Sequence, residues 1–462
     1  MRNLLLLFFM LLLPIMANAS EAESIVINGI NYSVDLENKT AEVSGYMGGE
    51  NITIPSSIEY QGTTYSVTSI GDYAFRYGSI TSVILPNGLV SIGYGAFEFC
   101  MSLESIDIPN SVTDIKGFAF SYCMGLSNIT FPNSAINIGN GAFEFTPWYF
   151  SQPDGLIYAG KIAYDLKGVN REDITSISIK DGTLGVAGGC FRICVNLTDV
   201  TIPNTVKIIG HGAFRDCRRL TTIIIPNSVT KIDYDAFEDC TSLSSVVLSD
   251  SLISIGHNAF GWCSGLTTIN LPENLIELGG FQGCINLCSI NFPNSLLYIR
   301  ENAFCGCIAL TSITIPNNVL SIGYQAFMNC SELKSIKLPN KIDTIAAATF
   351  YGCNKLNTIT LSCTTPPAIM LNAFNKKHYQ NTIVNVPVGY GSIYRSHLNW
   401  GEFKNINEVE MSVIKSPQID IQQEKVDCIY NIKGELLPAK DYNQLSKGLY
   451  IVNGKKIAYG NR

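Results

Sequence analysis

The feature that most constrains the fold is an internal repeat between Phe75 and Phe374, in which a Phe, usually preceded by Ala, returns with a spacing that is 23 residues almost throughout. Ten of these phenylalanines have a Cys three residues later, and in most units a Pro lies eleven residues before the Phe. Because one unit carries too few apolar side chains to enclose a core, successive units must stack as coils and share one. The marked residues are Phe75, Phe97, Phe120, Phe143, Phe191, Phe214, Phe237, Phe260, Phe281, Phe304, Phe327, Phe350 and Phe374.

Each unit also predicts its own local structure. The stretch Leu-x-x-Ile-x-Ile alternates with a period of two and is β-branched, so we expect one short parallel strand per coil, ended by the following Pro. The Gly before Ala-Phe supplies a turn, and the small Ala lets the chain fold over the core. The sequence therefore predicts a β-rich solenoid of about 13 coils over residues 69–375, with a parallel sheet on one face.

This unit, seen almost undiluted between Leu310 and Cys330, resembles the BspA-like leucine-rich repeat, the bacterial 23-residue type. The resemblance covers residues 50 to 375. It implies a right-handed leucine-rich-repeat solenoid in a surface protein of a kind often linked to adhesion to host matrix proteins or to other cells. Function is only loosely tied to this fold, so the resemblance carries over no fixed set of binding residues.

The regions outside the array have their own expected roles. Residues 1–19 have a short positive end, an apolar stretch and a small-x-small motif ending at Ala19, which is typical of a signal peptide cleaved near that residue. We expect an N-terminal strand cap over residues 20–68 and a C-terminal cap over 376–409, because an open array needs its core and its unpaired edge covered. Residues 410–462 predict a C-terminal β-module that resembles a type IX secretion sorting domain; a plain terminal module is the alternative.

Two irregularities interrupt the period. Phe143 and Phe191 are 48 residues apart, and about 25 extra residues there predict a protruding hairpin insertion over residues 146–168. The spacing from Phe260 to Phe281 falls to 21, so one turn near Gly279 and Gly280 is expected to be shortened.

Composition and motifs argue against several function classes. The net charge of −7 without a basic run disfavours nucleic acid, and no segment beyond the leader is long and apolar enough to span a membrane. No catalytic, cofactor-binding or metal-binding motif is present, so we expect no enzyme activity, no cofactor and no metal.

The Cys column is expected to hold buried thiols, because in-register side chains fit disulfide geometry poorly. Pairing among the five cysteines outside the column stays open, and these are Cys190, Cys288, Cys305, Cys363 and Cys428.

A binding face is suggested two residues after each Phe. Tyr77, Phe99, Tyr122 and Phe145 occupy that position in four consecutive coils, and with Trp148 and Tyr149 they are the candidate binding patch. The alternatives are that the inserted hairpin covers these rings, or that the Ser and Thr on the outer side of the strands form the binding face instead.

We expect a secreted or cell-surface, adhesin-like protein that recognises a host or cell-surface protein. A glycan-binding module for nutrient capture, taking a polysaccharide, and a purely structural surface protein are the other interpretations.

Overall fold

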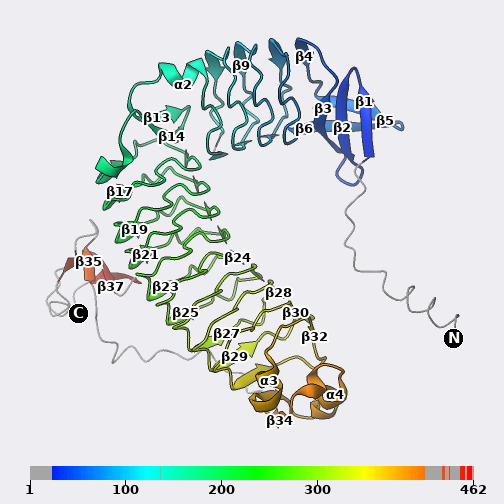
Figure 1. Ribbon diagram of the computed structural model, residues 1–462, viewed down its shortest axis with the longest axis vertical. Helices are drawn as coiled ribbons and strands as arrows, with labels where there is room; N and C mark the ends of the chain where they lie inside the picture. The colour runs from blue at the N-terminus through cyan, green and yellow to red at the C-terminus, as the bar shows by residue number, and fades with distance from the viewer. Residues whose placement is uncertain are drawn as a thin grey trace. The chain divides into compact units, whose positions relative to one another are not determined.

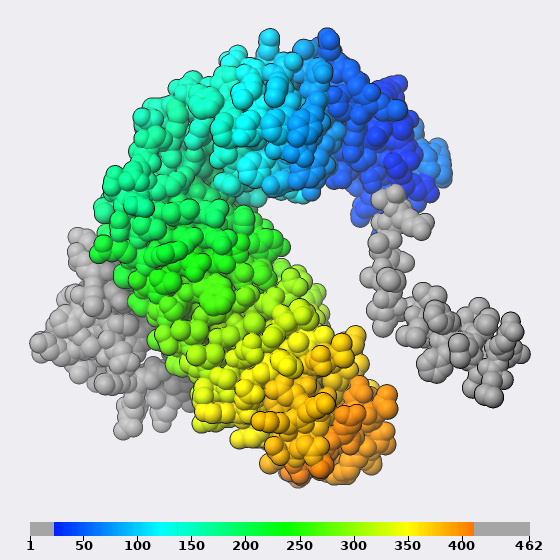
Figure 2. Space-filling view, in the orientation of Figure 1, coloured from blue at the N-terminus to red at the C-terminus, as the bar shows by residue number. Residues whose placement is uncertain are grey.

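The computed structural model describes residues 23–410 except residue 136, together with the backbone of four short strands between residues 429 and 459 (Figure 1). The expected signal peptide lies outside the described residues. The chain forms two compact units. Unit 1 comprises residues up to Pro153 with Ala159–Ile162, and unit 2 comprises Asp154–Tyr158 and the residues from Ala163 onward. Within each unit the coils pack directly side by side (Figure 2).

Unit 1 begins with a strand meander. β1 (Glu23–Ile27), β2 (Ile30–Asp35) and β3 (Thr40–Tyr46) pair antiparallel in that order, and β5 (Ser57–Tyr60) pairs antiparallel with β6 (Thr63–Ile70). β3 also pairs parallel with β6, so the meander continues into the array as its first rung. The exposed edge of the array is thereby hydrogen-bonded at this end.

Every regular coil contains two parallel strands, one more than the repeat pattern predicts. The expected strand lies on the Ile-x-Ile stretch, and a second, two-residue strand ends on the Ile before the turn Gly, where its backbone bonds to both neighbouring coils. The first row is β4 (Asn51–Thr53), β7 (Ser82–Ile84), β9 (Ser105–Asp107), β11 (Asn128–Thr130), β15 (Ser176–Ser178), β17 (Asp199–Thr201), β19 (Thr222–Ile224), β21 (Ser245–Val247), β23 (Thr268–Asn270), β25 (Ser289–Asn291), β27 (Ser312–Thr314), β29 (Ser335–Leu338) and β31 (Thr358–Leu361).

The second row is the more continuous one. In unit 2 it runs unbroken from β14 through β16 to β28, whereas the first row is divided into shorter sheets. After β6, the second row is β8 (Ser91–Ile92), β10 (Asp114–Ile115), β12 (Asn137–Ile138), β16 (Gly185–Val186), β18 (Ile208–Ile209), β20 (Lys231–Ile232), β22 (Ser254–Ile255), β24 (Glu277–Leu278), β26 (Tyr298–Ile299), β28 (Ser321–Ile322), β30 (Thr344–Ile345) and β32 (Ala368–Ile369).

The inserted residues form a short helix and a hairpin. α2 (Pro147–Ser151) is capped by the Thr146 hydroxyl, and β13 (Gly155–Ala159) and β14 (Ile162–Lys167) follow it. A single 3-10 turn, η1 (Arg171–Asp173), leads to the next coil. Because β14 pairs with β16, the hairpin supplies the first two strands of the sheet of unit 2 and does not protrude as expected.

The C-terminal end of unit 2 is closed by helices that the sequence reading did not predict. α3 (Lys376–Asn381), α4 (Gly391–Ser396) and the 3-10 turn η2 (Trp400–Glu402) alternate with β33 (Ile383–Pro387) and β34 (Asn405–Val409), which extend the sheet of β31 in parallel. The indole of Trp400 is fully buried, and its Nε1–H donates to the Pro367 carbonyl at 2.7 Å. This end of the core is thus covered by aromatic side chains.

Beyond residue 410 the described backbone consists of β35 (Ile429–Asn431), β36 (Leu436–Leu437), β37 (Gly448–Val452) and β38 (Lys455–Tyr459), paired antiparallel in the order β36-β35-β37-β38. A β-module was expected here.

The core of each unit is organised around a spine of stacked phenylalanines. Successive rings lie nearly parallel, with centroids 4.9 Å apart for Phe75 and Phe97 and 5.8 Å apart for Phe327 and Phe350. The rings are fully buried. Each coil therefore contributes one ring whose faces contact its neighbours, and this nearest-neighbour packing is what a single repeat lacks when alone.

The cysteine column forms a second line inside the core. The Cys100 thiol donates to the Phe75 carbonyl at 3.1 Å, and Cys240 donates to the Phe214 carbonyl at 3.2 Å in the same way. All fourteen cysteines of the described residues are free thiols, so the open question of pairing is answered for each off-column cysteine except Cys428, which lies outside them. Burial raises the pKa of Cys100 and of Cys284 to about 12, so these thiols act as protonated donors.

Candidate functional site: the aromatic turn face of unit 1

The turn that follows the second strand holds one coil to the next through three backbone hydrogen bonds. In the coil of Phe75, the N–H groups of Tyr73, Phe75 and Tyr77 donate to carbonyls of the next coil at 2.8, 2.8 and 2.9 Å. The outer two residues of this set have left-handed backbone, with φ of 60° at Tyr73 and 61° at Tyr77. Two positive-φ positions, two residues before and two residues after the Phe, thus recur along the array.

The four aromatic residues predicted two positions after the Phe form a continuous stack, which we call the aromatic ladder. Ring centroids are 4.9 Å apart for Tyr77 and Phe99, 4.6 Å for Phe99 and Tyr122, and 4.3 Å for Tyr122 and Phe145. Adjacent planes differ by 15° or less in all three pairs. Tyr77 is 66% exposed and Phe145 is 39% exposed, while the two rings between them are half-buried. The structure therefore leaves the ladder open to solvent and does not cover it with the hairpin.

The left-handed backbone at the ladder position makes an aromatic residue there energetically unfavourable. All four ladder residues have φ between 58° and 61°, a region that bulky side chains avoid at a cost of about 1 kcal/mol or more each. Later coils hold the same position with residues suited to that conformation, such as Gly283, Gly306 and Asn329. In unit 1 this position is aromatic in four successive coils, whereas in unit 2 the bulky residues Ile193 and Trp262 occupy it singly, with φ of 63° and 59°.

A second aromatic row, formed by Tyr73, Tyr94 and Phe118, lies on the other side of the same turns. Its rings meet edge to face, with centroids 5.5 Å apart for Tyr73 and Tyr94 and 5.4 Å apart for Tyr94 and Phe118. A Cβ atom at Gly95 would come within 2.8 Å of the Tyr73 ring, so the glycine makes room for it. The sequence interpretation missed this row, although an aligned column two or three residues before each Phe would have revealed it.

A cation links the two rows. The Arg76 guanidinium lies 5.1 Å from the Tyr73 ring centroid and 4.8 Å from that of Tyr77, and its Nε contacts the Glu98 carboxylate at 2.7 Å. Such cation–π contacts fix the position of aromatic rings as well as that of the cation. The face is therefore held in place before any partner arrives.

The two remaining predicted patch residues are placed differently. Trp148 packs against Phe131 and Phe143, with ring centroids 5.1 and 5.4 Å apart, and so closes the end of the spine in unit 1. Tyr149 is half-buried and meets the Phe150 ring edge to face at 5.9 Å. Phe150, which is 58% exposed and 6.5 Å from Phe145, extends the ladder where Trp148 was expected to do so.

Charged groups that could suggest chemistry are arranged as ion pairs in unit 2. Asp235 accepts from His211 at 3.2 Å and lies 3.7 Å from Arg215, which also pairs with Glu238 at 2.9 Å. The hydrogen bond to Asp235 raises the pKa of His211. Among the described residues, no group of three or more His, Cys, Asp and Glu side chains is arranged to hold a metal ion. A search of the same residues finds no helix of the length and hydrophobicity that a membrane crossing requires.

These observations define the class: a coiled array with short parallel strands and a leucine and phenylalanine core is a leucine-rich-repeat protein. The sequence matches the family described as the BspA type leucine rich repeat region in six copies, over residues 49–151, 186–280 and 276–396. The chain belongs to this family.

Solved structures give a looser comparison. A leucine rich cell surface protein from Faecalibacterium prausnitzii is 26% identical, with 74% of this chain and 95% of that one covered and a TM-score of 0.32. A leucine-rich repeat protein from Bacteroides ovatus is also 26% identical, with 73% and 94% covered and a TM-score of 0.29. The pneumococcal vaccine antigen PcpA is 17% identical, with 85% and 99% covered and a TM-score of 0.33. No protein of curated function is similar enough to the chain to count as a relative.

Proposed function

We propose that the protein is a non-catalytic, adhesin-like recognition protein of the cell surface or its surroundings, and that it binds a protein partner through the aromatic turn face of unit 1. The observation that carries the proposal is the aromatic ladder, four successive rings kept at left-handed backbone positions. Strain of this kind persists where the surrounding structure and the function of a site both require it.

The geometry of the ladder favours protein over sugar as its ligand. A sugar ring stacks on the open face of an aromatic side chain, but neighbouring ladder rings, with centroids 4.3 to 4.9 Å apart, cover both faces of Phe99 and Tyr122 and one face each of Tyr77 and Phe145. Along the middle of the ladder the ring edges remain accessible, and these edges carry partial positive charge and suit carbonyl groups, carboxylates and other aromatic rings. A protein surface offers all three kinds of group.

Flexible apolar side chains extend the same face. Met101 and Met124 lie two residues beyond Phe99 and Tyr122 and are 56% and 49% exposed. Methionine side chains adapt to differently shaped partners. Rigid rings beside adaptable methionines are the composition expected of a contact surface for another protein.

Binding of the full chain to an array of matrix proteins and polysaccharides tests the proposal. We expect a protein ligand whose binding is lost in the triple variant Tyr77→Asn, Phe99→Asn, Tyr122→Asn, because Asn accepts left-handed backbone while removing the rings. The matched control is Ile193→Asn with Trp262→Asn, which changes the same position, with φ of 63° and 59°, in unit 2.

Retained binding in the triple variant would remove the ladder from the proposed function. Loss of binding in the control but not in the triple variant would move the site to unit 2. A purely structural role for the solenoid predicts no specific ligand for any of these proteins.

A further inference from the structure

The shortened coil of Phe281 removes two residues from one turn of unit 2. Its neighbours read Gly-His-Asn-Ala-Phe at Gly256–Phe260 and Arg-Glu-Asn-Ala-Phe at Arg300–Phe304, whereas this coil reads Gly279, Gly280, Phe281. Aligned on the Phe, the coil lacks the residues that correspond to His257 and Asn258. The residues three positions before each Phe form a row along the array. This row therefore has a gap at the coil of Phe281.

The deletion also breaks one line of backbone hydrogen bonds. In unit 2, the residue two positions before the Phe donates its N–H to the next coil, as Asp235 does to the His257 carbonyl at 3.0 Å and Asn302 to the Tyr324 carbonyl at 2.9 Å. Asn258 has no such acceptor, because the next coil lacks the residue that would supply it. For the same reason the Glu301 carbonyl receives no N–H from the preceding coil.

Asn258 carries a second unsatisfied group. Its side-chain Oδ1 is buried and has no hydrogen-bond partner. Burying a polar atom without a hydrogen-bond partner destabilises the folded state. The turn thus leaves the backbone N–H and the side-chain oxygen of Asn258 without hydrogen-bond partners, beside the place where two residues are missing.

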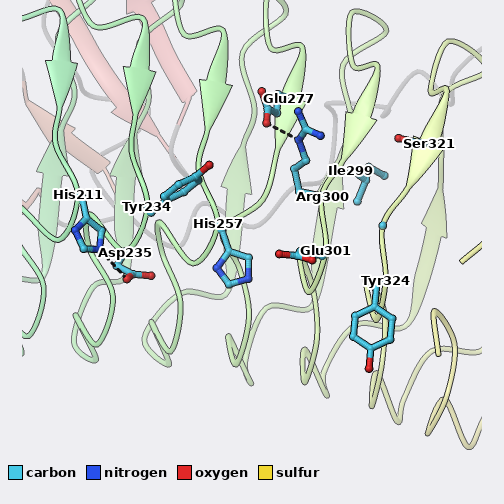
Figure 3. A pocket seen from close by; sticks show the side chains of 11 residues that line it. His211, Tyr234, Asp235, His257, Glu277, Ile299, Arg300, Glu301, Ser321 and Tyr324 are labelled. Atoms are coloured by element: carbon cyan, nitrogen blue, oxygen red, sulfur yellow. Dashed lines mark hydrogen bonds and ion pairs between the residues drawn. The ribbon is translucent and has the colours of Figure 1, made fainter. Parts of the chain in front are cut away.

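The surface is hollowed at this place. A groove of about 730 Å³ is lined by the row residues on either side of the gap, including Tyr234, His257, Glu301 and Tyr324 (Figure 3). Glu277 and Arg300 also line the groove, and they form an ion pair with each other. We call this groove the notch. Its size is that of an ordinary small-ligand site.

Some polar side chains of the notch form ion pairs with each other, and others remain available to bond to a ligand. His211 pairs with Asp235, and Arg300 pairs with Glu277. Neither His257 nor Glu301 makes a side-chain hydrogen bond or ion pair within the described residues. A free carboxylate disfavours anionic ligands, and the acceptors and donors at hand match hydroxyl groups, each of which both donates and accepts.

Two tyrosines complete the lining. Tyr234 is 58% exposed and Tyr324 is 47% exposed, and they lie four coils apart along the row. In contrast to the aromatic ladder, neither ring is stacked on another ring of the described residues, and both rings line the groove. Open aromatic faces beside hydroxyl-binding groups are the combination that recognises a sugar, whose rings have apolar faces and polar edges.

We propose that the notch is a binding site for neutral oligosaccharides, in which Tyr234 and Tyr324 contact sugar faces while Glu301 and His257 bond to hydroxyl groups. This site is separate from the aromatic turn face of unit 1 and does not depend on the protein-binding role proposed for that face.

The test is calorimetric titration of the full chain with neutral hexasaccharides of glucose, mannose, galactose and xylose, and with hexalysine and an oligogalacturonate for comparison. We expect at least one neutral hexasaccharide to bind, and the two charged probes not to. Binding of hexalysine or the oligogalacturonate in place of the neutral sugars overturns the proposal, as does absence of any neutral binding at millimolar concentration.

A variant with the notch filled locates the site. Inserting Ser-Asn between Gly279 and Gly280, together with Gly280→Ala, restores the 23-residue period and returns the missing rung without changing any other lining residue. We expect this variant to melt at or above the temperature of the parent chain and to lose sugar binding. Unchanged binding in a folded filled variant overturns the proposal.

A single substitution provides an independent measurement. Tyr324→Ser is expected to weaken sugar binding about tenfold, whereas Tyr351→Ser, an equally exposed tyrosine at 45% that does not line the notch, leaves it unchanged. Equal effects of the two substitutions contradict the proposed site. The triple variant of the aromatic ladder is expected to bind sugar normally, which separates this proposal from the proposed function.

Discussion

The rings of Tyr122 and Phe145 stack with centroids 4.3 Å apart, and both residues have left-handed backbone, with φ of 58° and 59°. The stacking stabilises a conformation that each residue alone would avoid. Because rings in neighbouring coils are about one strand spacing apart, the array brings them into contact without any further adjustment.

Two phenylalanines of the same turn are expected to differ sharply in their effect on stability. Phe97→Ala empties a site in the buried spine and should cost about 3 to 5 kcal/mol. Phe99→Asn removes a ladder ring but also relieves the left-handed backbone, so it should cost less than about 1 kcal/mol. Thermal unfolding followed by circular dichroism measures both. A large loss of stability in Phe99→Asn would mean that the ladder is structural.

Thiol reactivity should separate Cys288 from the column. Cys288 is the one exposed cysteine among the described residues, whereas the column thiols are fully buried. In a Cys428→Ser background, we expect one fast thiol in the native protein when it is titrated with a colorimetric disulfide reagent. The partly buried Cys305 should react more slowly, and the buried thiols should react only as the array opens. Rapid reaction of many thiols under native conditions would contradict a closed core.

The buried thiols predict loss of stability at alkaline pH. Burial raises the pKa of Cys100, Cys194 and Cys284 from 9.0 to about 12. Between these values the unfolded chain releases protons that the folded chain retains, so the unfolding free energy falls as pH rises, by about 1.4 kcal/mol per pH unit for each such thiol. This stabilisation is fully present below pH 9.

Denaturant unfolding at several pH values between 8.5 and 11 checks this prediction. Cys284→Ala should lower stability at every pH but reduce the slope against pH. Cys288→Ala, at the exposed thiol, should leave the slope unchanged. Identical slopes for the parent chain and Cys284→Ala would exclude the buried thiol as their cause.

The C-terminal cap should be acid-sensitive through His378. Its Nε2 bonds to the Cys353 carbonyl at 2.9 Å, and its Nδ1 accepts from the Asn375 N–H at 3.1 Å, which is the pattern of a neutral imidazole. Burial lowers the pKa of His378 below 6.5. The unfolded chain therefore binds a proton first, and stability is lost as pH falls below 6.5.

Limited proteolysis at pH 7 and pH 5 tests this expectation. Cleavage within residues 376–409 should increase at the lower pH in the parent chain, because a second proton on His378 would displace the Asn375 hydrogen bond. In His378→Gln the difference between the two pH values should be smaller. An equal increase in both proteins would assign the acid effect to another group.

The repeat allowed much of this structure to be predicted. The period of 23, the Phe spine and the unpaired Cys column follow from apolar residues that recur in register, because each must enter a core shared between coils. The aromatic ladder was predicted for the same reason, since alternation turns the residue before each interior Cys outward. The position of Trp148 was not predicted, because an insertion has no repeat to define which way its side chains point.

Other features depend on contacts between coils that no single unit contains. The second strand of each coil is two residues long, as Ser254 and Ile255 show, and becomes a strand only because both neighbouring coils present backbone groups to it. Left-handed backbone at Tyr77, Phe99, Tyr122 and Phe145 likewise follows from the inter-coil hydrogen bonds of the turn.

The sequence by itself determined the coiled array, its core and the aromatic composition of one turn face, since periodicity specifies which side chains point inward. The tertiary structure alone decided that the ladder rings cover one another's faces, and that a deletion of two residues leaves Asn258 and Glu301 without their backbone partners. Both outcomes arise where one coil meets the next, so they depend on distances between residues far apart in the chain.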